Sequence, residues 1–168
     1  MRRGLAAALI ILIPPLLWWF FIRPIATTVT VYFTAAAAGE HTLAPVSRTV
    51  RARSTGSRLR EAYRALLAGP TAEERAAGLS SEIPAGTRLR GVVVGGGVAA
   101  VDLSAEIERG GGSSSMLARV WQIVYTGTQF PAVPKVRILI EGQNRQALGG
   151  EGVIIEAPMP RPEQTPTF

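Results

Sequence analysis

The chain has 168 residues, with 18 basic and 12 acidic side chains, a net charge of +6 and no cysteine. The lack of cysteine excludes disulfides, thiolate nucleophiles and zinc–sulfur sites, and it removes the residue that carries the lipid of a lipoprotein. Nucleic acid is not an expected partner, because the arginines are spread along the chain and do not form a patch with stacking aromatics.

The N-terminal segment has the pattern of a membrane anchor. Arg2 and Arg3 precede an uncharged run from Leu5 to Ile22. At about 1.5 Å per helical residue this run reaches about 27 Å, close to the roughly 30 Å of a bilayer core. We predict an uncleaved signal anchor over residues 1–25, a single transmembrane helix with its N-terminus in the cytoplasm and the rest of the chain outside.

A cleaved signal peptide is the alternative for this segment. It too begins with basic residues and has an apolar centre. The apolar run is longer than most signal-peptide centres, and the residues after Ile22 lack the spaced small residues of a cleavage site. Trp18 and Trp19 lie toward the outer end of the run, where aromatic rings suit a membrane interface, although Pro14 and Pro15 interrupt the helix. These features favour the anchor.

About 140 residues remain, which suffices for one domain. Thr28 to Phe33 alternates β-branched and aromatic residues, and this pattern predicts a strand with one buried face. A turn of small residues is expected at Ala35 to Glu40. Val46 to Arg53 alternates weakly and is predicted to be a second strand at a sheet edge.

Two helical segments and a loop follow. Apolar residues at helical spacing predict the first helix. It is expected to begin at Ser57, which can cap it, and to end at Gly69-Pro70, because proline cannot continue a helix. Thr71 and Glu74 fit a capping box for a short turn of helix. Glycine, serine and proline then indicate a loop over residues 78–86.

A β-hairpin is the clearest element. Residues 87–94 and 98–103 read as strands around the triplet Gly95 to Gly97, which supplies the positive φ angles of a tight turn. The triplet does not fit a phosphate-binding loop, since no helix follows it and no Gly-Lys-Ser/Thr completes it.

The remaining elements are predicted from shorter patterns. Ser104 to Glu108 is expected to form a helical turn, and the glycine–serine run over 110–115 a flexible loop, one of whose serines caps a second helix. A strand is expected at Val136 to Ile140, and a short final strand at Val153 to Ile155. The apolar stripe of the second helix comprises Leu117, Val120, Trp121 and Val124.

This order of elements predicts an α+β fold. We expect a two-layer domain over residues 26–157, with two amphipathic helices on one face of a mostly antiparallel or mixed sheet, preceded by the one transmembrane helix. Residues 158–168 contain four prolines and are predicted to form a disordered tail.

Catalysis has little support in the residue pattern. The only histidine, His41, lies in a turn-like segment with no second ligand for a metal, and Ser113 to Ser115 have no base or Gly-x-Ser-x-Gly elbow. Asp102 is expected to cap the turn that leaves the hairpin; a catalytic role would need Glu106 or Glu108 as its partner. We therefore predict no catalytic, cofactor-binding or metal-binding residue, and no cofactor.

Six motifs occur in one order over the part of the chain outside the anchor. They are Val29-x-Val-Tyr-Phe33, Leu66-Leu-x-Gly-Pro70, Gly78-Leu-x-Ser-x-Ile-Pro-x-Gly-Thr87, Val101-Asp-Leu-Ser104, Gln122-Ile-Val-Tyr-Thr126 and Ile138-Leu-Ile-Glu-Gly142. Together they resemble the GerMN domain, a module named after a spore-germination protein and found in bacterial envelope proteins. Gln122 and Thr126 match a pattern of this family and are expected to hydrogen-bond loop backbone beneath the helix.

The resemblance implies a non-enzymatic envelope module. The germination protein is a lipoprotein with tandem modules, so a sporulation role does not follow for a single, helix-anchored module. We expect a scaffold or binding domain in the cell membrane, acting through an envelope protein partner, self-association or peptidoglycan. Arg48, Arg51 and Arg53 on a possible edge strand give weak support for strand pairing with a partner. The alternatives are a peptidoglycan-remodelling enzyme or its accessory factor and, more weakly, a polyanion binder.

Overall fold

The computed structural model describes residues 25–37, 40–149 and 153–168. The predicted anchor over residues 1–25 therefore lies outside the described residues, apart from Ile25. Within the described ranges, no helix has both the length and the apolar character needed to cross a membrane.

The first sheet is built on one long hairpin. β1 (Ile25–Ala37) pairs antiparallel with β2 (Glu40–Ala52) over its full length, and β3 (Leu79–Ser80) pairs with the other edge of β1 near its end. The alternation that predicted β1 buries Val31 and Phe33 on one face. Both strands are longer than expected, because the residues predicted to form a turn continue the ladder as far as 37 and 40.

The second sheet has strand order β4-β5-β6-β7. β4 (Leu89–Gly95) and β5 (Val98–Leu103) form the predicted hairpin, whose turn uses Gly96 and Gly97 at φ 57° and 75°. β6 (Lys135–Ile140) lies parallel to β5, so the chain crosses over between them through a helix.

Two short strands extend the other edge of β6. β7 (Gln143–Asn144) and β8 (Met159–Pro160) both pair with it antiparallel. The strand expected at residues 153–155 is reduced to a single bridge between Ala147 and Ile154. Disorder was predicted for residues 158–168, but the start of this segment is a strand. Pro160 pairs with Lys135 of β6, and Met159 pairs with Val136.

The helices are α2 (Thr55–Leu67), α3 (Ala72–Ala76) and α4 (Ser113–Gly127), with a 3₁₀ turn η1 (Ala105–Glu108). The capping box of α3 and the turn at η1 are confirmed. Two predicted caps are wrong.

The first wrong cap is at α2. Ser54, not Ser57, occupies the N-cap position, and Ser57 is the third helical residue of the same capping box. The second is at α4, whose N-cap is Gly112, so no serine side chain caps this helix. α4 begins at Ser113, the first serine of the glycine–serine run. The Ser115 hydroxyl hydrogen-bonds the Glu82 carboxylate, as described below.

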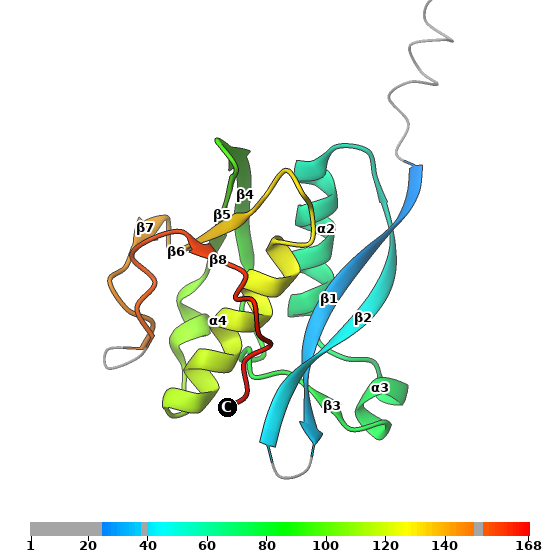
Figure 1. The fold of residues 1–168 in the computed structure, drawn as a ribbon, viewed down its shortest axis with the longest axis vertical. Helices are drawn as coiled ribbons and strands as arrows, with labels where there is room; N and C mark the ends of the chain where they lie inside the picture. The colour runs from blue at the N-terminus through cyan, green and yellow to red at the C-terminus, as the bar shows by residue number, and fades with distance from the viewer. Residues whose placement is uncertain (1–24, 38–39, 150–152) are drawn as a thin grey trace, which may run out of the picture.

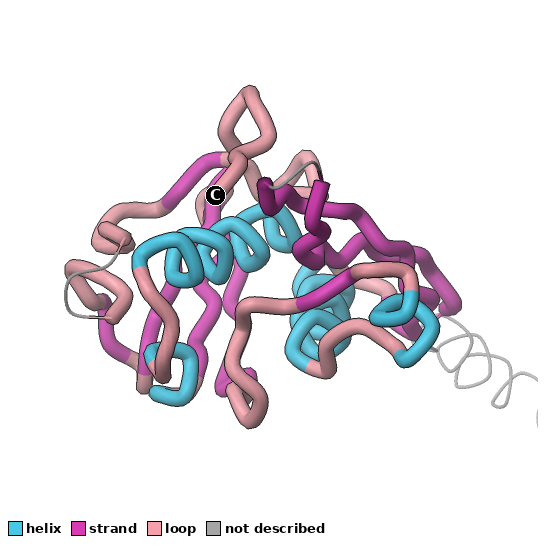
Figure 2. The backbone as a smooth tube through the Cα atoms, turned by 90° about the horizontal axis from the view of Figure 1, so that it is seen from below, coloured by secondary structure: helices cyan, strands magenta, loops and turns pink. Residues whose placement is uncertain are grey.

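The α+β class is confirmed, but the single sheet with helices on one face is wrong. The chain forms two sheets, and both long helices lie between them (Figures 1 and 2). α2 packs on β1 and β2 and also on β4, while α4 packs on β1 and also on β6. The sheets cannot join, because side chains of α4 occupy the edge of β1 that a further strand would need.

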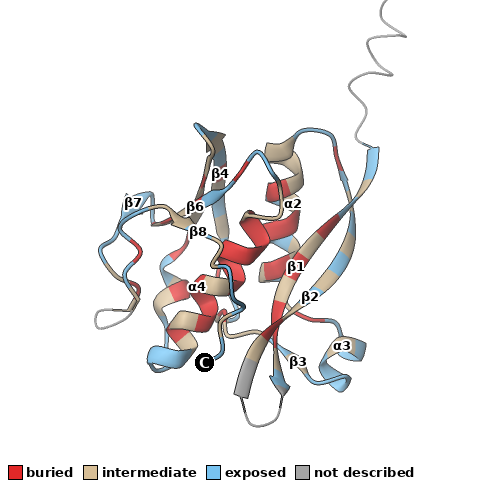
Figure 3. Cartoon of the chain, in the orientation of Figure 1, coloured by how far each residue is buried: buried red, intermediate tan, exposed pale blue. Residues whose placement is uncertain are grey.

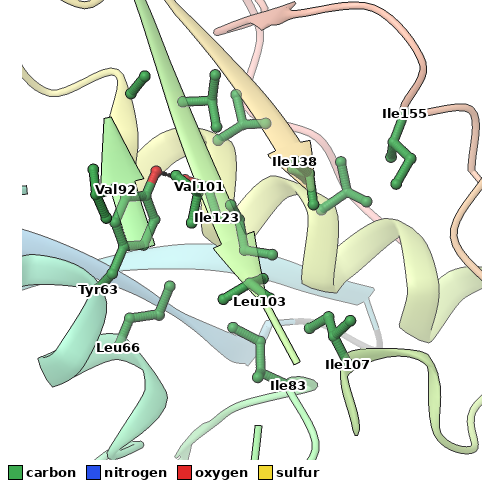
Figure 4. Packing of buried hydrophobic residues seen from close by; sticks show 14 of the residues in the cluster. Tyr63, Leu66, Ile83, Val92, Val101, Leu103, Ile107, Ile123, Ile138 and Ile155 are labelled. Atoms are coloured by element: carbon green, nitrogen blue, oxygen red, sulfur yellow. Dashed lines mark hydrogen bonds between the residues drawn. The ribbon is translucent and has the colours of Figure 1, made fainter. Parts of the chain in front are cut away.

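The core follows from this arrangement. Apolar side chains of both helices and both sheets meet in one cluster, shown as the red inner faces of Figure 3. Tyr63 is fully buried in the cluster, where Figure 4 shows it pointing from α2 toward Ile123 on α4. Its hydroxyl donates to the Ile123 carbonyl over 3.1 Å. Burial raises the pKa of Tyr63, so the phenol stays protonated.

Candidate functional site

The inner edge of β1 is closed by side chains of α4. The Gln129 amide accepts from the Thr30 N–H and donates to the Thr30 carbonyl, both over 2.8 Å. One pair further along, Thr126 Oγ1 accepts from the Tyr32 N–H over 3.2 Å, and Gln122 Nε2 donates to the Tyr32 carbonyl over 3.0 Å. Two side chains of α4 and that of Gln129, just past its end, therefore take the place of a neighbouring strand.

The prediction for Gln122 is confirmed, because its Oε1 accepts from the N–H of Glu82 in the loop over 3.0 Å. Thr126 differs from the prediction, since it bonds a strand and not a loop. Gln129 was missed. Gln129 lies two residues past the end of α4, so the helical pattern of the sequence did not single it out.

The outer edge of β2 remains open within the described residues, since β2 ends the strand order β2-β1-β3. Main-chain groups alternate sides along a strand. The main-chain groups of Thr30 and Tyr32 point toward α4, so those of Val29 and Val31 point toward β2. There Val29 lies opposite Arg48, and Val31 lies opposite Val46.

The residues between these partners therefore face outward. Ser47, Thr49 and Arg51 direct their main-chain groups away from β1, and Pro45, in the same set, has no N–H to offer. All four side chains are exposed as well. The predicted edge strand is confirmed, with one end blocked by proline, as in many natural edge strands.

Of the three arginines predicted on the edge strand, Arg48 and Arg51 belong to β2, while Arg53 follows its end. The Arg48 guanidinium binds the Glu74 carboxylate through two bonds of 2.6 Å and lies 5.6 Å from the centre of the Phe33 ring. These bonds hold the pKa of Glu74 below its ordinary value. Arg48 is thus engaged within the domain, whereas Arg51 is exposed.

Two carboxylates considered for catalysis, Asp102 and Glu106, are engaged with arginines or backbone. Asp102 accepts the N–H of Gly142 over 2.7 Å and pairs with Arg90 over 3.1 Å. Asp102 bonds a backbone N–H, as expected. That N–H belongs to Gly142 after β6, however, and not to the turn after the hairpin, because the parallel pairing brings Gly142 beside the end of β5. Glu106 lies within 3.6 Å of Arg88 and 3.5 Å of Arg109, and its pKa is lowered chiefly by a hydrogen bond with Ser104.

The remaining residues considered for chemistry are dispersed. The backbone of His41 belongs to β2, opposite Ala36, so the expected loop position is wrong. Ser115 donates to Glu82 Oε2 over 2.7 Å. No group of three potential metal ligands occurs in the described ranges 25–37, 40–149 and 153–168.

Arg119 ties several loops to α4. Its side chain is 3% exposed, and it donates to the carbonyls of Glu82, Ile107 and Gly110 over 2.8 Å each. Burial lowers its pKa, and the Glu82 charge opposes this. The network closes one side of a cavity of about 380 Å³ at the start of α4, whose lining residues are Glu82, Gly112, Ser113, Ser114, Ser115, Ala118 and Phe168.

Known proteins share this architecture. The tandem GerMN domains of the sporulation protein GerM from Bacillus subtilis match with a TM-score of 0.69 at 22% identity, over 83% of this chain and 47% of that one. This chain therefore spans about half the length of that structure. The first GerMN domain of GerM matches with a TM-score of 0.58 at 23% identity, over 80% of this chain and 98% of that one.

A candidate lipoprotein from Clostridium perfringens matches with a TM-score of 0.59 at 22% identity, over 81% of this chain and 88% of that one. At these identities the matches show the fold alone. A comparison with curated proteins found no match. A family model named Germane and described as sporulation and spore germination matches residues 30–146, which is more than half of the chain. The predicted resemblance is confirmed: the chain belongs to the Germane family and carries one GerMN-type module.

Proposed function

We propose that this protein is a non-enzymatic binding module of the bacterial cell envelope that takes up an extended segment of a partner protein along the outer edge of β2. The N-terminal segment holds it at the outer face of the cell membrane. The single observation that supports this function is the open edge of a 13-residue strand in the first sheet.

The edge offers main-chain hydrogen bonds to an added strand. From Ser47 to Arg51, every second residue directs one N–H and one carbonyl outward, and Pro45 limits the addition on one side. In strand addition the main chain supplies affinity, while the alternating side chains supply specificity. β1 cannot serve in the same way along Thr30 and Tyr32, because α4 already occupies those groups.

The position of this edge favours a partner close to the membrane. Thr49 lies opposite Thr28, three residues after Ile25, where the predicted anchor ends. At about 3.4 Å per strand residue, Thr49 lies roughly 10 Å along the strand from the end of the anchor. At that distance from the membrane, a second membrane-bound protein is a more accessible source of an extended segment than the cell wall.

Site-specific crosslinking tests the proposal. A photoreactive amino acid replaces Thr49 in the full chain in its own membrane, and an otherwise identical chain carries it at exposed Arg109, directly after η1. We expect a discrete protein adduct from position 49 only. Adding Ser47→Pro, which removes an outward N–H as Pro45 already does, should abolish the adduct, whereas Ser47→Ala should retain it.

Two outcomes would overturn the proposal. An adduct that survives Ser47→Pro would show that the neighbour does not pair with the edge. Co-sedimentation of the full chain with isolated peptidoglycan sacculi, without any protein adduct at position 49, would identify the wall as the ligand instead.

A further inference from the structure

Residues 161–168 lie along the outer side of α4 (Figure 1). The preceding strand β8 is held on β6, and the segment then runs back along the helix until Phe168 lines the cavity at the start of α4. Seven steps of an extended chain span at most roughly 24 Å. The 14 residues from Thr128 back to Ser114 span about 21 Å of helix, so the two lengths match.

Arg161 occupies a receptor for a guanidinium group at the C-terminal end of α4. Its three nitrogens donate to Thr128 Oγ1 over 3.0 Å, to the Tyr32 hydroxyl over 3.2 Å and to the Tyr125 carbonyl over 2.6 Å. Its central carbon lies 4.6 Å from the ring centre of Tyr125 and 5.2 Å from that of Tyr32.

These contacts select a planar cation without using a carboxylate. The two tyrosine rings meet edge to face at 5.3 Å, and such rings attract a cation over their faces. The carbonyls at a helix C-terminus favour positive charge, and the fork of arginine matches several acceptors at once, which lysine does not. Within the described residues, Arg161 forms no ion pair with a carboxylate.

The segment after Arg161 is held weakly. Outside the strand ladders, no main-chain to main-chain hydrogen bond joins residues 162–168 to the rest of the described chain. Beyond Arg161, the Tyr125 hydroxyl donates to the Gln164 carbonyl over 3.3 Å, and Phe168 lines the cavity. Beyond the β8 ladder the segment is held by side chains, so the Arg161 side chain and residues 162–168 can be exchanged for a similar segment while β8 stays on β6.

We propose that this side of α4 is a second interaction surface, which binds an extended Arg-Pro segment of a partner protein. The chain's own Arg161-Pro162 segment is the resident competitor. A partner binds by displacing residues 161–168, so the tail sets a threshold for binding. This surface is separate from the β2 edge, and neither proposal depends on the other.

Competition by a labelled peptide tests this inference. The probe is a fluorescein-labelled peptide with the sequence of residues 158–168, and its binding to the full chain in detergent micelles is measured by fluorescence anisotropy. A tethered segment acts at an effective concentration of the order of 1 mM. For an intrinsic Kd of about 100 μM, the resident tail weakens binding of the probe roughly tenfold.

We therefore expect Arg161→Ala to bind the probe about ten times more tightly than wild type. Arg137→Ala, on the neighbouring strand β6, should behave as wild type. A probe with alanine in place of its arginine should not bind Arg161→Ala, and adding Tyr125→Leu to that variant should abolish binding. Arg161→Lys, which keeps the charge, should show a smaller gain in affinity for the probe. If Arg161→Ala does not unfold cooperatively, the comparison of Arg161→Lys with wild type is the test.

The inference is overturned if neither Arg161 variant gains affinity over wild type. It is equally overturned if the arginine-free probe binds as tightly as the original, since the surface would then not read the guanidinium. In either case residues 161–168 are a fixed strap between the two sheets and not a displaceable ligand.

Discussion

Gln129 bonds both main-chain groups of Thr30, each over 2.8 Å, as a residue of a neighbouring strand would. α4 and the residues just after it thus occupy the inner edge of β1 along Thr30 and Tyr32. The consequence is functional, because within the described residues the outer edge of β2 stays open. It is also structural, because the two sheets stay separate and the helices are enclosed between them (Figure 2).

The first prediction concerns this pair. Gln129→Ala should lower the free energy of unfolding by about 1–3 kcal/mol, because it leaves a donor and an acceptor of half-buried Thr30 without partners. The measurement is urea unfolding of the full chain in detergent. Gln146→Ala, at an exposed position, should change it by less than about 0.5 kcal/mol. Equal effects of the two substitutions would contradict the strand-like role of Gln129.

A second prediction compares two glycines in helices. A Cβ on Gly127 would lie 2.2 Å from the Tyr63 hydroxyl and 2.4 Å from a methyl of Val136, whereas one on Gly56 has nothing within 4 Å. Gly127→Ala should therefore destabilise the fold by about 1–3 kcal/mol through overpacking. Gly56→Ala should stabilise it by about 0.5–1 kcal/mol, since alanine loses less entropy in a helix.

Thermal unfolding of both variants checks this pair. A neutral Gly127→Ala would mean that α4 does not approach α2 and β6 as closely as these distances indicate.

The third prediction concerns Arg119. Arg119→Met should cost about 3 kcal/mol or more, because it removes the donor from three loop carbonyls while filling a similar volume. Arg119→Lys should recover only part of this loss, since a compact ammonium cannot reach three carbonyls in the geometry of the guanidinium fork. Arg109→Met, whose side chain is 73% exposed in the wild type, is the control and should be close to neutral. Chemical denaturation with a tryptophan fluorescence readout distinguishes the three variants.

The sequence predicted those parts of the fold that local patterns control. Alternation located β1, glycine angles located the turn at Gly96, and the Thr71–Glu74 spacing located α3. Cap positions were less certain, because two serines three residues apart both fit the start of α2, and only the structure assigns Ser54 as the cap.

Long-range contacts could not be predicted from these patterns. The bonds between Gln129 and Thr30 join residues 99 apart, and nothing in either local segment indicates that a helix will bond a strand edge. Arg161 was missed for a related reason. The prolines around Arg161 predict disorder by composition. The groups that bind Arg161 lie on α4 and β1, which are distant from it in sequence.

The last prediction is a pH dependence at the Arg48–Glu74 pair. The hydrogen bonds from Arg48 lower the pKa of Glu74 in the folded protein. A carboxyl whose folded pKa lies below the unfolded value of about 4.3 contributes stability above that pH and loses it as the pH falls through the folded pKa. Each side chain is 20% exposed, so the contribution is that of a partly screened pair.

A double-mutant cycle with Glu74→Gln and Arg48→Met measures this contribution. Glutamine keeps the capping bond from the Thr71 N–H, so the substitution removes the charge and not the cap. We expect a favourable coupling free energy at pH 6, where the carboxylate is ionised, that falls toward zero as the pH approaches 3. A coupling that stays constant over this range would mean that the two side chains stabilise the domain by packing, through Arg48 on the Phe33 ring, and not by their charges.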